Sequence, residues 1–200
     1  WDMPDFDDHE ALHLMRDAES GLSAIIAIHS THLGPAGGGT RFWHYADSEA
    51  AITDALRLSR GMSYKNAMAG LAMGGGKAVI LSDAKGMKSP EMISAFARAI
   101  DSLGGRYVTA QDVGMSAADM VAISQGTRYV SGLPPKDGGA GGDPGPTTAM
   151  GVFLGVKAAV RRALGKDDLA GVHIAIQGGG SVGGGVGRHG AAVGGRISRA

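Results

Sequence analysis

The chain has 200 residues, of which 44% are hydrophobic and 19% are charged, and this composition is that of an ordinary globular protein. Its formal net charge is +0 at pH 7, which gives no basis for attraction to nucleic acid or to a membrane surface. Cysteine is absent, so disulfides and thiolate chemistry are excluded. No apolar run approaches the roughly 20 residues of a membrane-spanning helix, and no leader-like segment is apparent. We therefore expect a cytoplasmic protein that binds a small molecule.

Strands and helices are predicted to alternate along most of the chain. Runs of branched aliphatic residues between glycines or polar residues predict buried strands at residues 21–29, 77–81 and 106–110. Helices are predicted to follow their capping residues, which are Asp47 or Ser48, then Ser89 before Pro90, and then Ser116 with Asp119. This alternation predicts an α/β fold with a largely parallel sheet.

The composition changes to proline, glycine and aspartate over residues 133–146, which predicts a linker or hinge. A helix is predicted at 147–164, ended by Gly165, and a strand at 172–177. We therefore place a domain boundary near Pro146, giving one domain at 1–146 and the first part of another at 147–200.

Lys77 is an unusual residue to find at the head of a buried strand. It must either extend to water or meet an anion, and the glycines at 74–76 would let a ligand approach it. Desolvation would lower the pKa of Lys77 and make it a usable base near neutral pH. The alternative is a lysine at a strand end that points into water. Asp112 follows the next predicted strand, where α/β sheets bind their ligands.

The segment Gly178–Gly183 matches Gly-x-Gly-x-x-Gly directly after an apolar strand. In that position backbone amides and a helix N-terminus bind the pyrophosphate of a dinucleotide. The run of glycines continues beyond Gly183, so the helix that should follow is poorly specified and a chance match is easier. The acid that distinguishes NAD from NADP should come about 20 residues later. Ser198 and Arg199 occupy that neighbourhood, so the choice stays open.

Two other patterns are misleading. Residues 9–13, His-Glu-Ala-Leu-His, match a zinc-protease helix signature, but no third-ligand motif accompanies them. Residues 70–78 resemble a phosphate-binding loop, yet alanine follows the lysine and a strand follows the loop. We expect no metal site.

Four segments, in this order, resemble the leucine, phenylalanine and valine dehydrogenases of the glutamate dehydrogenase superfamily: GPAGGGTRFW (34–43), GMSYKNAMAGLAMGGGKAVI (61–80), YVTAQDVGMSAADM (107–120) and GDPGPTTAMGVFLGVKAA (142–159). The likeness runs from about residue 21 to residue 183. It implies a mixed α/β substrate-binding and oligomerisation domain, followed by the start of a Rossmann-like dinucleotide-binding domain. It also implies a homo-oligomer that uses NAD to deaminate an apolar L-amino acid oxidatively and reversibly to a 2-oxo acid.

The resemblance implies roles for individual residues. Lys65 matches the lysine that binds the substrate α-carboxylate. Lys77 matches the lysine that bonds the carbonyl or carbinolamine oxygen and activates water, and Asp112 matches the acid that moves protons to and from the amino group. The other implied residues are Gly37, Gly38, Gly39 and Ala110 for the substrate, and Thr148, Gly178, Gly179, Gly180, Ser181, Val182 and Gly183 for the cofactor.

Two questions about function stay open at this stage. Glutamate-specific relatives resemble one another in carrying a lysine at the position of Gly37, so glycine there favours an apolar substrate. Gly37 would enlarge the pocket towards aromatic side chains, whereas Ala110 resembles the aliphatic enzymes. Relatives also continue well beyond the first strand and turn of the nucleotide domain. We therefore expect a piece of a longer enzyme, and the alternative is a non-catalytic amino-acid-binding and oligomerisation remnant.

Overall fold

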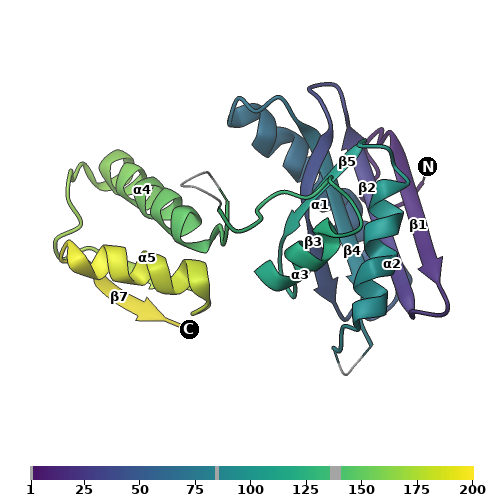
Figure 1. The fold of residues 1–200 in the computed structure, drawn as a ribbon. Coiled ribbons are helices and arrows are strands. Elements are labelled where there is room, and N and C mark those ends of the chain that lie inside the picture. The colour runs from purple at the N-terminus through teal and green to yellow at the C-terminus, as the bar shows by residue number, and fades with distance from the viewer. Residues whose placement is uncertain (1, 84–85, 136–140) are drawn as a thin grey trace. The chain divides into compact units, whose positions relative to one another are not determined.

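The computed structural model describes residues 2–83, 86–135 and 141–200. The chain divides into two compact units, Trp1–Gly142 and Asp143–Ala200 (Figure 1). Part of the predicted linker, residues 136–140, lies outside the described residues. The assignment of one unit to the substrate and the other to the cofactor stays a prediction.

A five-stranded sheet in the order β1-β2-β4-β3-β5 forms the centre of the first unit (Figure 1). Its strands are β1 (Ala11–Asp17), β2 (Leu22–Ser30), β3 (Ala36–Trp43), β4 (Gly74–Leu81) and β5 (Tyr107–Gln111). β2 pairs with β1 and β4 in antiparallel fashion, and β3 runs parallel to both of its neighbours, β4 and β5. The carboxyl ends of β3, β4 and β5 therefore meet at one edge of the sheet.

Helices cover both faces of this sheet. Ala51, Ala55 and Leu56 of α1 (Ser48–Met68) pack in one cluster with Ile25, Ala27 and Val79. Ile93, Phe96 and Ile100 of α2 (Pro90–Asp101), with Met120 and Ile123 of α3 (Ala117–Ser124), pack in another cluster with Ile26, Ile28 and Ile80. Successive strand residues point to opposite faces, so α1 lies on one side of the sheet and α2 and α3 on the other. Each fully buried large side chain contributes about 1.5–3 kcal/mol.

The predicted helix starts are confirmed by their caps. The Asp47 carboxylate accepts a hydrogen bond from the first turn of α1, and Ser89 does the same for α2, which has Pro90 in its first turn. Ser116 and Asp119 form the reciprocal capping box of α3. Local side-chain chemistry therefore sets where these helices begin.

The sequence analysis missed two strands of the five-stranded sheet and misjudged the direction of its strand pairings. β1 is a half-exposed edge strand, and Leu14 within it is 67% exposed. β3 contains the glycines at 37–39, which have low strand propensity and are held by parallel neighbours on both sides. The expectation of a largely parallel sheet is wrong, because both pairings of β2 are antiparallel. β4 begins at Gly74, so Lys77 lies within a strand instead of at its head.

The second unit is a βαβ arrangement preceded by a helix. Its elements are α4 (Gly145–Leu164), β6 (His173–Ile176), α5 (Ser181–Ala192) and β7 (Arg196–Arg199). Gly165 ends α4, as predicted, and this cap residue has the left-handed conformation. β6 and β7 are parallel. The glycine-rich α5 forms because it packs closely on α4: a Cβ at Gly185 would lie only 2.5 Å from the Cβ of Ala149.

The mixed α/β fold class is thus confirmed, with the βαβ start of a Rossmann-like arrangement in the second unit. Among the described residues, no helix combines the length and the apolar character that crossing a membrane requires.

Candidate active site

Lys77 and Asp112 meet on the face of the sheet that α1 covers. Lys77 lies in β4 and Asp112 directly follows β5, with β3 between these two strands. The Lys77 Nζ donates a hydrogen bond to Asp112 Oδ2. The lysine side chain is 7% exposed and the aspartate side chain 24% exposed, so this ion pair is largely shielded but reachable at the carboxylate. The structure therefore brings together two of the residues that the sequence selected.

The electrostatics of the pair suit proton transfer. Burial lowers the pKa of Lys77, although its hydrogen bond with Asp112 and the negative charge of that residue act in the opposite direction. Burial alone would raise the pKa of Asp112, but the hydrogen bond and charge of Lys77 outweigh it, and the pKa is lowered. Val113 N–H also donates to Asp112 Oδ1 at 2.8 Å. The site thus combines an ionised acceptor with a lysine that gives up its proton more readily than usual.

Glycines in β3 allow this strand to lie close to the backbone of β4 and to the Asp112 side chain. A Cβ at Gly38 would lie 1.7 Å from the Gly76 carbonyl oxygen, and one at Gly39 would lie 2.8 Å from the Asp112 Cβ. The buried Tyr107 hydroxyl donates to the Gly38 carbonyl at 2.7 Å and fixes this segment. A side chain at either glycine would displace the neighbouring strand or the aspartate.

The remaining substrate residues lie around the same strands. Ala110 pairs with Gly39 in the ladder between β5 and β3. The space beside Gly37 is occupied by Met73, because a Cβ there would lie 2.4 Å from Met73 Cε. Lys65 is exposed in the last turn of α1, and within the described part of the chain no hydrogen bond or ion pair joins it to Lys77 or Asp112.

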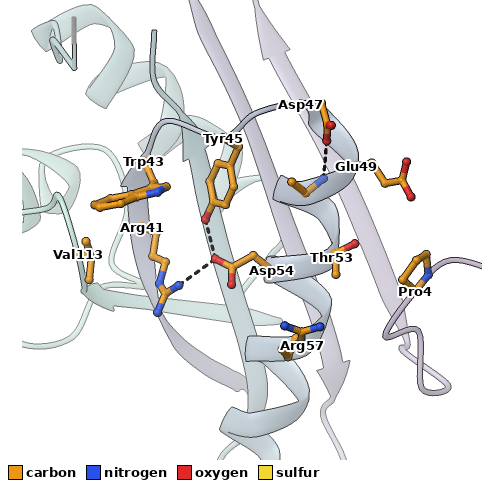
Figure 2. Close-up of a pocket in the computed structure, with 11 residues that line it drawn as sticks. Pro4, Arg41, Trp43, Tyr45, Asp47, Glu49, Thr53, Asp54, Arg57 and Val113 are labelled. Carbon is orange, nitrogen blue, oxygen red and sulfur yellow. Dashed lines mark hydrogen bonds and ion pairs between the residues drawn. The ribbon is translucent and has the colours of Figure 1, made fainter. Parts of the chain in front are cut away.

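Sequence reasoning missed Arg41, Asp54 and Tyr45. Arg41 of β3 donates from Nε to Asp112 Oδ2 at 3.2 Å and from Nη1 to Asp54 Oδ2 of α1 at 2.9 Å. The Tyr45 hydroxyl donates to the same Asp54 oxygen at 2.6 Å (Figure 2). The signal available in the sequence was Arg41, a charged residue between Thr40 and Phe42, which both favour strands. Its two carboxylate partners could be found only from the fold.

A cavity of about 790 Å³ lies beside this network (Figure 2). Arg41, Tyr45 and Asp54 line it, together with Trp43 and Arg57. Arg57 pairs with Asp5 at 2.6 Å. The charges of Arg41, Asp54 and Arg57 are therefore balanced within the protein, as are those of Lys77 and Asp112.

The predicted cofactor residues lie in the second unit. Gly178–Gly180 form the turn between β6 and α5, and Gly180 caps α5 without any side-chain hydrogen bond. A Cβ at Gly183 would lie 2.3 Å from the Gly178 carbonyl oxygen, so the turn is tight. The amides at the start of α5 are thus free of a side-chain cap, and this arrangement fits a pyrophosphate group. Thr148 is exposed in the first turn of α4.

The zinc-protease pattern is not helical. His9 precedes β1 and His13 lies within it. The His9 ring is buried, and its Nε2 lies 3.0 Å from both the Leu56 carbonyl oxygen and Ser59 Oγ. These contacts give His9 a structural role between the N-terminal segment and α1.

Comparisons with known proteins agree with this arrangement. Residues 9–129 match the family described as Glu/Leu/Phe/Val dehydrogenase, dimerisation domain. The chain therefore belongs to this dehydrogenase family.

Individual relatives cover most of the chain. It is 55% identical over 175 residues, 88% of its length, to leucine dehydrogenase from Bacillus subtilis, and covers 48% of that protein. It is 53% identical over 88% of its length to valine dehydrogenase from Streptomyces virginiae, covering 49% of that protein. The crystal structure of L-tryptophan dehydrogenase from Nostoc punctiforme matches with a TM-score of 0.69 and 40% identity, over 96% of this chain and 59% of the other. The chain spans about half the length of the curated relatives it matches.

Proposed function

We propose that the protein carrying this chain deaminates an apolar L-amino acid oxidatively and reversibly, with NAD as the hydride acceptor. The observation that carries the proposal is the shielded contact between Lys77 and Asp112, in a chain of the dehydrogenase family. An amino acid, NAD⁺ and water would give a 2-oxo acid, ammonium, NADH and a proton.

Each residue has a defined part in this reaction. When bound, the nicotinamide takes the hydride from the α-carbon. Lys65 binds the α-carboxylate. Its ammonium is exposed and has no hydrogen-bond or ion-pair partner among the residues that the structure describes. Asp112 accepts a proton from the amino group as the imine forms. Lys77 deprotonates the water that adds to the imine carbon and then bonds the new oxygen, while Asp112 returns a proton to the departing ammonia.

The surroundings of Gly37 support an apolar substrate. Glycine supplies no cation, and the nearest side-chain atoms to its missing Cβ belong to Met73, with Asn66 Nδ2 at 3.6 Å. The Asn66 amide already donates to the Gly74 carbonyl at 2.6 Å. A substrate carboxylate at this place would be buried without a counter-charge, which is costly. Branched aliphatic and aromatic side chains meet no such cost.

The cofactor, location and assembly complete the proposal. NAD would be bound by Thr148 and the turn at 178–183. The protein would be cytoplasmic and would assemble as a homo-oligomer through its first unit, which matches a dimerisation domain. The intact Lys77–Asp112 pair favours an enzyme over a non-catalytic remnant.

NADH formation tests the proposal directly. The protein that carries this chain with its nucleotide-binding domain should reduce NAD at alkaline pH with leucine, valine or phenylalanine. Lys77→Ala should abolish turnover, and Lys65→Ala should raise KM, whereas Lys166→Ala, at an exposed position outside both sites, should change neither. Activity with glutamate alone would contradict the apolar pocket. No turnover with any amino acid would support the remnant instead.

A further inference from the structure

Asp112 is held by more than its contact with Lys77. Its Oδ2 accepts from both Lys77 Nζ and Arg41 Nε, and its Oδ1 accepts from the Val113 amide. A lysine alone would hold the carboxylate through a flexible stem, whereas a guanidinium offers a planar, rigid set of donors. Arg41 therefore restricts where the carboxylate can stand.

Arg41 is itself fixed at two points. It uses Nε for Asp112 and Nη1 for Asp54, so the guanidinium plane is fixed between the residue that follows β5 and α1. Asp54 is fixed in turn by the Tyr45 hydroxyl. The Arg41 and Asp54 side chains are 29% and 24% exposed, so solvent competes with these contacts only in part. The three side chains form a support that reaches Asp112 from two further elements.

The support also changes the charge around Lys77. Lys77 and Arg41 are cations and Asp112 and Asp54 are anions, so the cluster is close to neutral as a whole. The positive charge of Arg41 disfavours the protonated form of Lys77, and the negative charge of Asp54 favours it. Removal of the Arg41 charge should thus raise the pKa of Lys77, and removal of the Asp54 charge should lower it.

We propose that Arg41, anchored by Asp54 and Tyr45, is a positioning residue that sets the place of the Asp112 carboxylate and the pH range over which the Lys77–Asp112 pair works. The catalytic part of this inference rests on the proposed deamination. The electrostatic part does not, because it concerns only residues of the first unit.

Nuclear magnetic resonance titration of the Lys77 ammonium in the whole chain tests the inference without turnover. The Lys77 ¹³Cε signal is assigned as the one lost in Lys77→Arg. Arg41→Met should raise the pKa of Lys77 and Asp54→Asn should lower it, because each variant removes one of the two charges that act on the ammonium in opposite directions. Arg41→Lys, which keeps the charge, should restore most of the native value. Arg57→Met is the matched control, because Arg57 lines the same cavity but pairs with Asp5; it should cause no shift.

The same variants in the complete protein give a second readout. The limb of the pH–kcat profile that reports Lys77 should move to higher pH in Arg41→Met and to lower pH in Asp54→Asn. Asp54→Asn keeps the side-chain shape, so it tests the effect of this network on the pKa of Lys77 even if Arg41→Met fails to fold. Shifts in the same direction, or none in Asp54→Asn, would overturn the inference. If Arg41→Met and Asp54→Asn shift the pKa of Lys77 in opposite directions but the complete protein has no turnover, the electrostatic coupling is supported and the proposed deamination is contradicted.

Discussion

Met73 should decide which side chains fit beside Gly37. A Cβ at Gly37 would lie 2.4 Å from Met73 Cε and 3.3 Å from its Sδ, so the thioether fills the space that glycine leaves. Gly37 lies two residues before Gly39 on the same face of β3, about 7 Å away. Because Gly39 abuts Asp112, a substrate whose amino group is at Asp112 can extend its side chain towards Met73. Gly37 by itself therefore does not make the pocket large.

Met73→Ala removes the γ, δ and ε atoms and leaves room for a larger substrate. Each buried group of methylene size contributes about 0.8 kcal/mol, so a larger substrate side chain that fills the space of these three atoms gains about 2 kcal/mol from burial. A difference of 1.4 kcal/mol is a factor of ten. We therefore expect the ratio of kcat/KM for phenylalanine to that for valine to rise about 10-fold or more.

Initial rates of NADH formation with the two amino acids measure this ratio. Met68→Ala is the control, because Met68 is 88% exposed and should leave the ratio unchanged. The thermal midpoint of each variant separates altered preference from lost protein, since truncation of a half-buried methionine costs up to about 2 kcal/mol. An unchanged ratio in a folded Met73→Ala protein would refute the placement of the substrate side chain near Gly37.

Three further outcomes follow from the geometry. Asp112→Asn should lower kcat about 10²–10⁴-fold in steady-state assays while the circular dichroism spectrum is retained; near-native turnover would exclude Asp112 as the proton carrier. Gly38→Ala should destabilise the chain by on the order of 3 kcal/mol in urea unfolding, because its Cβ meets backbone at 1.7 Å. The control Gly61→Ala lies in open space within α1 and should stabilise the chain by about 0.5–1 kcal/mol. Equal effects of the two substitutions would contradict the close strand contact. Burial lowers the pKa of His9 below 6.5, so the unfolded chain takes up the proton first and stability should fall as pH drops below about 6.5. In His9→Gln, the urea midpoint should depend less steeply on pH over this range. An unaltered pH dependence would show that His9 does not contribute.

The sequence was sufficient where the controlling interaction is local. The capping residues Ser89 and Ser116 lie within a few residues of the amides they bind, so they could be recognised directly. Lys77 stood out because a charged residue among aliphatic ones requires an explanation. The resemblance to known dehydrogenases then supplied Asp112 as a partner, and the structure joins the two.

The rest depends on which strands become neighbours. Arg41 contacts Asp112 only because β3 lies between β4 and β5, and it contacts Asp54 only because α1 crosses the same face. None of these pairings leaves a local pattern in the sequence. β3 was missed for a related reason, since its glycines lack strand propensity and the strand is held by its two neighbours.

The concentration of glycine in β3 and β4 has a physical explanation in this site. A Cβ at Gly75 would lie 2.1 Å from Ser63 Oγ of α1, and those at Gly38 and Gly39 would meet Gly76 and Asp112. Each glycine costs roughly 0.5–1 kcal/mol in a strand interior relative to alanine, but it allows the close approach of helix and strands and, at Gly39 in the strand between β4 and β5, leaves room for Asp112. A side chain at Gly39 would displace Asp112, which is the counter-ion of the buried Lys77. The charged pair therefore accounts for glycine at position 39, where strand propensity alone would disfavour it.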